Sequence, residues 1–235
     1  MFLMRAFLNP DSAAVRADLT DPEGLHKTVM RAFADLVGPR ARQEQAVLHR
    51  LDRDGAGRLV LLIQGRVRPD PARWLAGYVA DVGSDLDLAF SQAENPIVRD
   101  VANERASIEV GRRFLFRLKA NTTKRLSGRG PNGSESNKGK RVPVRGDDAR
   151  REWLARHAAA AGFRCDVASV KVGELAPEGR SSGKRVTFAG AMFEGILEVE
   201  DAAKFRLALE HGVGPAKAYG FGLLSIAAAV RRTAR

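Results

Sequence analysis

Residues 47–66 read VLHRLDRDGAGRLVLLIQGR, and this stretch decides the fold. Two runs rich in aliphatic residues, 47–53 and 58–66, flank the turn-forming sequence DGAG at residues 54–57. Apolar runs separated by a short, glycine-containing turn are typical of two antiparallel strands joined as a hairpin. The segment therefore predicts a hairpin, and the elements on either side of it indicate the class of fold.

Strands and helices alternate around this hairpin. Residues 1–8 predict a strand that ends at an Asn-Pro pair, and Asp21 followed by Pro22 predicts the start of a helix. Pro71 predicts the start of a second helix, and residues 86–90 predict a last strand. The resulting order is β-α-β-β-α-β, which is the ferredoxin-like (RRM-like) unit.

The second half of the chain repeats this order. It predicts a strand at 114–120, a helix at 147–162 capped by Asp147, a long hairpin of 165–175 and 184–199, a helix from Asp201 and a strand at 223–230. A Gly/Ser/Asn-rich tract at residues 127–139 predicts a mobile loop. We therefore expect an α+β chain with two tandem ferredoxin-like domains and antiparallel sheets, at residues 1–95 and 108–235.

The charge of the chain is distributed asymmetrically. Its 235 residues include 39 Lys plus Arg against 28 Asp plus Glu, which gives a formal net charge of +11. Residues 112–145 hold eleven basic residues and one acidic residue, so nearly all of the net charge lies in this segment. Because an ordinary surface mixes both signs, the segment predicts binding to a polyanion, either a nucleic acid or an anionic membrane surface.

The sequence also narrows the compartment. No run approaches the ~20 apolar residues of a membrane-spanning helix. The apolar residues 1–8 are interrupted by Arg5 and stopped by an Asn-Pro-Asp sequence, which argues against a signal peptide. A single cysteine, Cys165, excludes an intrachain disulfide framework. These features predict a cytoplasmic protein that is not inserted in a membrane.

Several motifs of hydrolytic enzymes are absent from the sequence. There is no cysteine pair, no HExxH and no GxSxG, so we expect any enzymatic activity to need neither a metal nor another cofactor. Of the four histidines, His49 and His157 predict ordinary surface or packing roles, and His211 suits the C-terminus of a helix. His26 lies one residue beyond the apolar stripe of its predicted helix, at a position that could face a ligand groove.

Residues 212–222 read GVGPAKAYGFG and are the most specific stretch of the chain. Glycines let backbone N–H groups approach an anion closely, and Lys217 adds a positive charge. The GxxxxGK[ST] spacing of a nucleotide-binding loop is absent. In a chain with such a basic segment, this composition favours contact with an RNA or DNA backbone over a purely structural loop. The glycines concerned are Gly212, Gly214, Gly220 and Gly222.

A family resemblance rests on six segments. They are FRLKANTTKR at 116–125, KGKRVPV at 138–144, MFEGILEV at 192–199, HGVGPAKAYGFGLLSI at 211–226, LNP at 8–10 and DPEGLH at 21–26. In content, order and spacing, these segments resemble the CasE (Cse3) family of endoribonucleases. This family processes CRISPR precursor RNA for the type I-E Cascade complex.

The resemblance implies tandem ferredoxin-like domains and cleavage of RNA without a metal or cofactor. In the implied reaction an RNA hairpin binds to a basic face, and the 2′-OH just upstream of the scissile phosphate attacks in line. The downstream 5′-oxygen leaves, and the upstream product ends in a 2′,3′-cyclic phosphate or a 3′-phosphate. The implied partners are the CRISPR repeat RNA hairpin, the mature crRNA and the other subunits of type I-E Cascade.

The resemblance also implies roles for single residues. His26 matches the family's catalytic histidine, and an imidazole with a pKa near ~6.5 can accept or donate a proton in this reaction. Glu23 stands where well-known members have tyrosine, so we expect it to orient the imidazole or raise its pKa. We expect Lys27 to neutralise phosphate charge. Glu23 in place of the tyrosine also supports an alternative function, that of a non-catalytic Cascade subunit that binds the crRNA hairpin. A third possible class is a basic protein that binds a membrane surface or DNA.

The residues expected to bind RNA come from the basic segment, the long hairpin and the glycine-rich loop. They are Arg112, Arg113, Arg117, Lys119, Lys124, Arg125, Lys138, Lys140, Arg141, Arg180, Lys184, Arg185 and Lys217. Among them, Arg180, Lys184 and Arg185 match the family's basic groove. Because double-stranded RNA is recognised mostly by its shape and its 2′-OH groups, we expect such a protein to discriminate against DNA.

Overall fold

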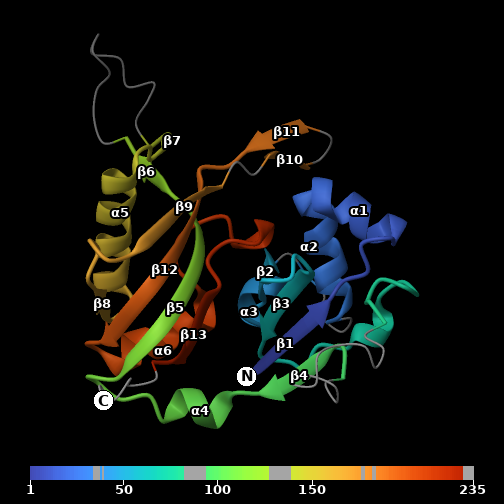
Figure 1. Ribbon diagram of the computed structural model, residues 1–235, viewed down its shortest axis with the longest axis horizontal. Helices are drawn as coiled ribbons and strands as arrows, with labels where there is room; N and C mark the ends of the chain where they lie inside the picture. Colours follow the sequence, from blue (N-terminus) through green and yellow to red (C-terminus); the bar gives the residue numbers. More distant parts are fainter. Residues whose placement is uncertain are drawn as a thin grey trace.

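Two antiparallel sheets, one in each half of the chain, form the framework of the computed structural model (Figure 1). The structure describes residues 1–33, 38, 40–81, 94–126, 139–175, 178–181 and 184–229. The elements of the first half are β1 (Phe2–Phe7), α1 (Ala13–Thr20), α2 (Pro22–Arg31), α3 (Ala41–Glu44), β2 (Leu48–Arg53), β3 (Leu59–Gly65), the short 3₁₀ helix η1 (Pro71–Arg73) and β4 (Ile97–Asp100). Their strand order is β2-β3-β1-β4, with antiparallel neighbours.

The hairpin of β2 and β3 confirms the prediction from residues 47–66. Its register pairs Leu48 with Gln64 and continues to the turn. At the turn, the Asp54 carboxylate accepts hydrogen bonds from the backbone N–H groups of Ala56 at 3.0 Å and Arg58 at 2.9 Å. An aspartate that bonds its own backbone two residues on is a common way to fix such a turn.

Helix α2 confirms the start that was predicted at Asp21 and Pro22. The Asp21 carboxylate accepts from the N–H of Glu23 at 3.0 Å, and proline takes the first helical position, where no backbone N–H is needed. The helix buries Leu25 and Val29 against the first sheet, in a core that also includes residues of β1, β2 and β3. Helix α1, which precedes it, was not predicted.

The helix predicted from Pro71 is wrong. Only the three residues of η1 are helical, and the chain then continues in turns with Gly77 at a φ of +73°. Trp74 and Tyr78 are nonetheless buried, with ring centroids 5.3 Å apart, and the Trp74 indole N–H donates to the carbonyl of Thr28 at 2.9 Å. The apolar spacing therefore reflects packing on the core, which a compact turn achieves as well as a helix.

The edge of the first sheet also differs from the prediction. The strand predicted at residues 86–90 lies outside the described residues. In the structure the edge strand is β4, which pairs with β1. Strand β4 begins at Ile97, although the first domain was expected to end at residue 95.

The second half contains the complete predicted order. Its elements are α4 (Ala102–Ala106), β5 (Arg113–Asn121), β6 (Thr123–Arg125), β7 (Arg141–Pro143), α5 (Asp147–Ala160), β8 (Phe163–Cys165), β9 (Lys171–Leu175), β10 (Glu178–Ser181), β11 (Lys184–Thr187), β12 (Gly190–Val199), α6 (Ala202–His211), the 3₁₀ helix η3 (Lys217–Tyr219) and β13 (Leu224–Ala228). The sheet order is β13-β5-β12-β8, with β9 also paired to β12. In both sheets the last strand therefore lies beside the first and the second beside the third, which is the ferredoxin-like arrangement.

Two details of the second half refine the predictions. The predicted cap at Asp147 is wrong: Gly146 is the N-cap of α5, and Asp147 is the first helical residue, where a negative charge favours the helix dipole. Most of the loop predicted at 127–139 lies outside the described residues, and the segments that flank it pair as β6 and β7.

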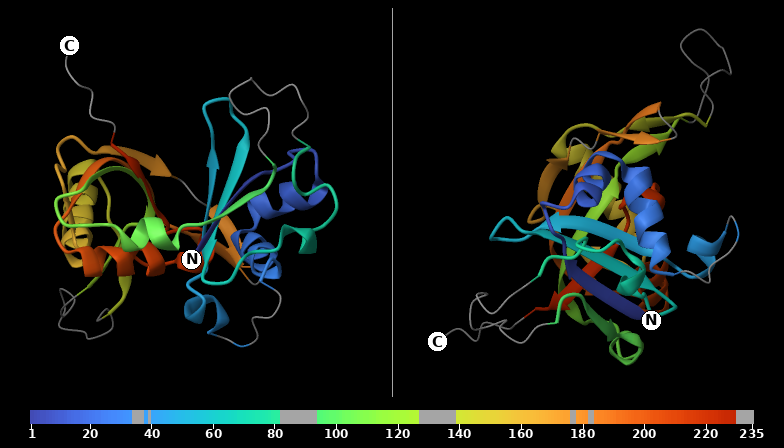
Figure 2. Two further views of the ribbon diagram at one scale, coloured as in Figure 1. Left: turned by 90° about the horizontal axis from the view of Figure 1, so that it is seen from below. Right: turned by 90° about the vertical axis from the view of Figure 1, so that its right-hand side faces the viewer.

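The two halves lie side by side, joined by the segment that contains β4 and α4 (Figures 1 and 2). Helices α1 and α2 cover the first sheet, and α5 and α6 contribute to a separate core on the second. The strand pair β10–β11 projects from the second half toward the first, and Cα atoms of β10 come within 8 Å of α1 and α2 (Figure 1). This projection brings the long hairpin to the helix that contains His26.

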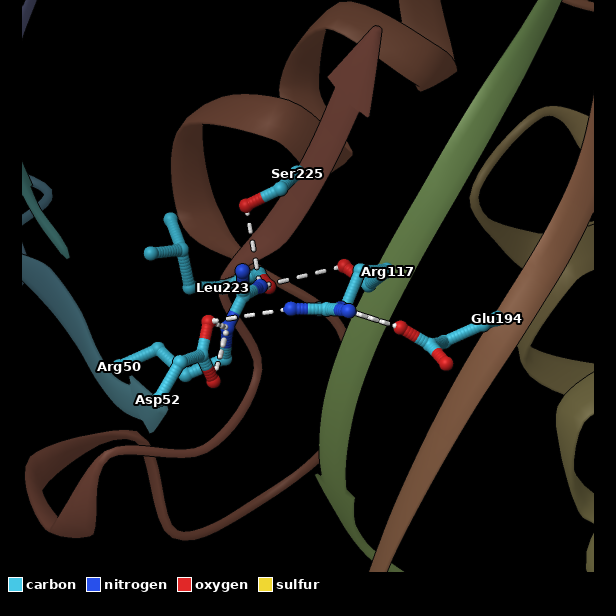
Figure 3. Close-up of polar contacts among 6 residues, drawn as sticks. All are labelled: Arg50, Asp52, Arg117, Glu194, Leu223 and Ser225. Atoms are coloured by element: carbon cyan, nitrogen blue, oxygen red, sulfur yellow. Dashed lines mark hydrogen bonds and ion pairs between the residues drawn. The ribbon is translucent and has the colours of Figure 1, made fainter. Parts of the chain in front are cut away.

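A buried arginine links the two sheets (Figure 3). Arg50 on β2 is 2% exposed, and its Nε donates to both carboxylate oxygens of Asp52 at 2.8 and 3.0 Å. Its Nη1 donates to the carbonyl oxygens of Arg117 at 3.2 Å and Leu223 at 3.1 Å, and to Ser225 Oγ at 3.0 Å. Because its partners lie on both sheets, Arg50 fixes the first sheet against β5 and β13.

Candidate functional site

Helix α2 places Glu23, His26 and Lys27 near the end that Asp21 caps. Glu23 and Lys27 lie one turn apart and form an ion pair at 3.1 Å. His26 lies beside the buried stripe of α2 and is half-buried, as its position in the sequence predicted. The geometry therefore gives Glu23 a cationic partner on its own helix.

The imidazole of His26 is partly withdrawn from solvent. Its Nδ1 is buried and has no hydrogen-bond partner among the residues that the structure describes. Burial, and next the positive charge of Arg42, lower the pKa of His26 from 6.5, and these effects outweigh the opposing influence of Glu23. Glu23 does act to raise this pKa, as expected, but the net pKa of His26 is lowered. At neutral pH the ring is uncharged and able to accept a proton.

His49 on β2 lies next to His26. The two ring centroids are 6.1 Å apart, with the ring planes inclined by 21°. His49 is fully buried, and burial, followed by the charge of His26, lowers its pKa to about 3. Its Nε2 also has no hydrogen-bond partner within the described part of the chain. His49 therefore stays neutral and forms one wall of the His26 site.

The glycine-rich loop packs against the edge strand β2 and reaches α2. Cα atoms of η3 come within 8 Å of both α2 and β2. A Cβ added at Gly220 would lie 3.5 Å from His49 Nε2, so the loop backbone packs directly on this histidine. The loop therefore covers the side of His49 and brings Lys217, which is half-buried, near the His26 site.

Two of the four predicted glycines serve the loop itself. The N–H of Gly212 donates to the carbonyl of Ala208 at 2.8 Å, and the N–H of Gly222 donates to the carbonyl of Lys119 at 2.8 Å. A Cβ on Gly212 would lie 2.7 Å from the carbonyl oxygen of Gly222. These two N–H groups are used inside the protein, so the prediction that they contact an anion does not hold for them.

The basic segment is not a single face of the protein. Strand β5 extends over roughly 30 Å at about 3.3 Å per residue, so Arg112 and Arg113 lie at one end of it and β6 at the other. Arg117 forms an ion pair with Glu194 and lies 3.9 Å from the Asp52 carboxylate (Figure 3). These partners occupy Arg117 at the contact between the sheets, where it was expected to bind RNA.

Lys119 is also directed into the protein. It is partly buried, its Nζ lies 5.3 Å from the centre of the Phe221 ring, and burial lowers its pKa. Arg112 is exposed and lies over the ring of Phe114 at 5.9 Å.

The β6–β7 pair gathers exposed cations at one place. Its register sets Arg125 opposite Arg141, with Lys124 next to Arg125 and Lys140 next to Arg141. All four side chains are exposed. Lys138 lies outside the described residues. Arg180 lies on β10, whose backbone is close to α2, and Lys184 and Arg185 lie on β11, which pairs with β10.

Neither a metal cluster nor a membrane span occurs among the described residues. No group of three or more His, Cys, Asp and Glu side chains there could hold a metal ion. No helix in these ranges is long and apolar enough to cross a membrane.

Comparison with known proteins identifies the family of the chain. The model of the family described as CRISPR associated protein matches residues 1–228. The chain belongs to this CRISPR-associated family. It is 32% identical to the CRISPR-associated endoribonuclease Cse3 of Thermus thermophilus, over 97% of this chain and 100% of that protein. It is also 30% identical to the CRISPR system Cascade subunit CasE of Escherichia coli, over 68% of this chain and 84% of that protein.

A solved structure extends the similarity to three dimensions. The CRISPR endoribonuclease Cse3 bound to a 19-nucleotide RNA matches with a TM-score of 0.75 at 30% identity, over 97% of this chain and 100% of that one. The family membership and tandem ferredoxin-like fold inferred from sequence are therefore confirmed.

Two residues of this CRISPR-associated protein have roles that its sequence did not predict. His49 was expected to be a packing residue, and its contact with His26 depends on the pairing of β2 below α2. Arg42 was not expected at the site at all, although its charge acts on His26, His49 and Lys217. Neither residue has a sequence signal, because their proximity to the site arises from contacts between distant segments.

Proposed function

We propose that this chain is an endoribonuclease that cuts CRISPR precursor RNA at the repeat hairpin and then stays on the crRNA as a subunit of Cascade. The similarity over the whole chain to Cse3 and CasE supports the substrate and the assembly. The observation that carries the reaction is the place of His26, a half-buried imidazole on α2, the helix that both β10 and the glycine-rich loop approach. Burial lowers the pKa of this ring, which favours its neutral form.

In the proposed mechanism the neutral ring of His26 accepts the proton of the 2′-OH just upstream of the scissile phosphate. The 2′-oxygen attacks phosphorus, and the bond to the downstream 5′-oxygen breaks in line. Since Nδ1 of His26 is buried, Nε2 is the nitrogen available to the RNA. The upstream product then ends in a 2′,3′-cyclic phosphate, and the departing 5′-oxygen takes up a proton.

The neighbours of His26 have supporting roles in this mechanism. Lys27 follows His26 directly and supplies positive charge toward the phosphate, where negative charge develops in the transition state. Glu23 pairs with Lys27 and so acts on its position more than on proton transfer. The exposed cations of β6 and β7 and the basic strands β10 and β11 hold the RNA hairpin.

The experiment is single-turnover cleavage of the cognate repeat RNA in the presence of EDTA, with the product ends analysed. We expect wild type and His157→Ala to cut and His26→Ala to lose cleavage by at least roughly 100-fold while it still binds the hairpin. His157 is a matched control because it is also half-buried, but it packs on Trp153 of α5. Binding without cleavage by the wild type would favour the non-catalytic subunit, and equal cleavage by His26→Ala would remove His26 from the reaction.

A further inference from the structure

A small pocket lies between α3 and the glycine-rich loop, next to the His26 site. Its volume is about 310 Å³, near the lower end of the range for ligand-binding pockets. Its polar side chains come from Arg42, Gln43, His211 and Lys217, and the rest of its wall is formed by alanine, leucine, glycine and proline. None of these lining residues is acidic.

Arg42 and Lys217 are half-buried cations that lack an acidic partner among the described residues. The guanidinium Nη1 of Arg42 donates a hydrogen bond to a neutral group, the carbonyl of Val47, at 3.3 Å. Burial lowers the pKa of both groups, and the charge of Arg42 lowers that of Lys217 further, so the two cations repel each other.

The two most buried arginines among the described residues each have a carboxylate partner. Arg50 bonds Asp52 at 2.8 Å, and Arg150 bonds Glu174 at 2.7 Å. Arg105, which is half-buried like Arg42, instead bonds the side-chain oxygen of Gln64 and the carbonyl of Leu209. Because removing a charge from water without a counter-ion is unfavourable, two uncompensated cations facing one pocket indicate that the counter-ion comes with a ligand.

The same pocket is electrostatically connected to the cleavage site. The charge of Arg42 lowers the pKa of both His26 and His49. Lys217 lies on η3, whose backbone approaches α2. A ligand group in this pocket would therefore lie beside RNA that is bound at His26.

We propose that Arg42 and Lys217 form a binding site for one phosphodiester of the bound RNA, a proposal that rests on the function proposed above. The guanidinium group matches two phosphate oxygens at once, and the ammonium group adds a second charge. The bound phosphate neutralises the pair and anchors the RNA beside His26. Arg42 is thus a positioning residue for the strand that is cut.

The first test measures binding of a repeat hairpin that contains a 2′-deoxy nucleotide at the cleavage position and so stays uncut. Affinities are measured for wild type, Arg42→Gln and Lys217→Gln between about 50 and 300 mM KCl. We expect each variant to bind roughly tenfold more weakly, with a salt slope smaller by about 0.7 to 0.9. Arg99→Gln is the matched control, because it removes one exposed arginine of β4 that does not line this pocket and is paired with Glu104 of α4.

The second test locates the phosphate. Single neutral methylphosphonate linkages are introduced along the hairpin, and each is measured with wild type and with both variants. At one position we expect the methylphosphonate to weaken binding by the wild type but not to weaken binding by either variant any further. Such non-additivity shows that Arg42, Lys217 and this phosphate take part in the same interaction. Thermal unfolding checks that each variant is folded, and Lys217→Gln carries the test if Arg42→Gln is not.

Two results would overturn the proposed phosphate site. In the first, Arg42→Gln and Lys217→Gln bind with the same affinity and the same salt slope as Arg99→Gln. In the second, each methylphosphonate weakens binding by the variants as much as binding by the wild type. A wild type that binds with the expected coupling but never cuts RNA would overturn the proposed cleavage and leave the phosphate site in place.

Discussion

The imidazole rings of His26 and His49 lie beside each other, with centroids 6.1 Å apart and planes inclined by 21°. His26 is half-buried on α2, and His49 is fully buried on β2. One ring is therefore partly accessible to solvent, and the other is enclosed by the protein. The pair connects the glycine-rich loop, which packs on His49, with the helix that positions His26.

The enclosure of His49 predicts how stability depends on pH. The pKa of His49 falls from 6.5 to about 3 on folding, so the unfolded chain binds a proton below pH 6.5 that the folded chain does not. The free energy of unfolding should therefore decrease as pH falls from 6.5 toward 3, by up to about 1.4 kcal/mol per pH unit from this group.

His49→Phe keeps an aromatic ring at this position but cannot bind a proton there. Its unfolding therefore reports the effect of the other groups that titrate at low pH. We expect its free energy of unfolding, measured with denaturant, to fall less steeply than that of the wild type below pH 6.5. Parallel curves for the two proteins would mean that His49 is protonated in the folded state.

The link between the two sheets predicts a large effect at Arg50. Arg50→Met leaves the Asp52 carboxylate, which is 8% exposed, with Arg117 at 3.9 Å as its remaining ion-pair partner within the described part of the chain. Removing one partner of a buried ion pair costs about 3–5 kcal/mol, so we expect a loss of this size in denaturant unfolding. Arg53→Met is the control, because Arg53 is exposed on the same strand and bonds the carbonyl of Gly57. Similar losses for the two variants would contradict the role of Arg50.

The glycine-rich loop predicts a difference between two substitutions with the same backbone cost. Gly212 and Gly57 have φ values of +76° and +78°, but a Cβ at Gly212 would lie 2.7 Å from a backbone oxygen, whereas no atom lies within 4 Å of one at Gly57. We expect Gly57→Ala to destabilise by about 1–2 kcal/mol and Gly212→Ala by about 1–3 kcal/mol more. Thermal unfolding measures both, and equal losses would mean that the loop yields without cost.

The exposed cations of β6 and β7 predict where the salt dependence of RNA binding originates. Substituting Lys140 and Arg141 with glutamine should reduce the slope of log affinity against log salt by about 0.7 to 0.9 for each RNA phosphate that is no longer neutralised. Arg117→Gln should leave the slope unchanged, because Arg117 pairs with Glu194. The reverse pattern would return Arg117 to the RNA surface and remove the β6–β7 pair from it.

Local signals explain why much of the fold could be predicted from sequence. The DGAG turn specified its hairpin, and Asp21 with Pro22 specified α2, because these residues bond or shape their own backbone. At Pro71 the same kind of signal failed, since the following aromatic residues pack on the core from turns. The spacing of apolar residues alone does not distinguish a helix from a series of turns that buries the same side chains.

The site was harder to predict, because it depends on contacts between distant segments. His26 was found by resemblance, whereas Arg42 and His49 have ordinary local surroundings in the sequence. The glycine-rich loop packs against β2 and brings Lys217 to the pocket of Arg42. Even the one-sided charge of residues 112–145 was divided by the fold, since Arg117 pairs with Glu194 and Lys119 is partly buried against Phe221, whereas the β6–β7 cations are exposed.

The most direct test of the account is the pH dependence of single-turnover cleavage, in EDTA and at subsaturating protein, of two repeat RNAs. One is unmodified, and in the other sulfur replaces the departing 5′-oxygen, so that the leaving group needs no proton. If neutral His26 accepts the 2′-OH proton, wild-type rates rise with pH through an apparent pKa below 6.5 on both RNAs, and His26→Ala is slow on both. Loss of this rise on the sulfur-containing RNA, or rescue of His26→Ala by it, would contradict the account.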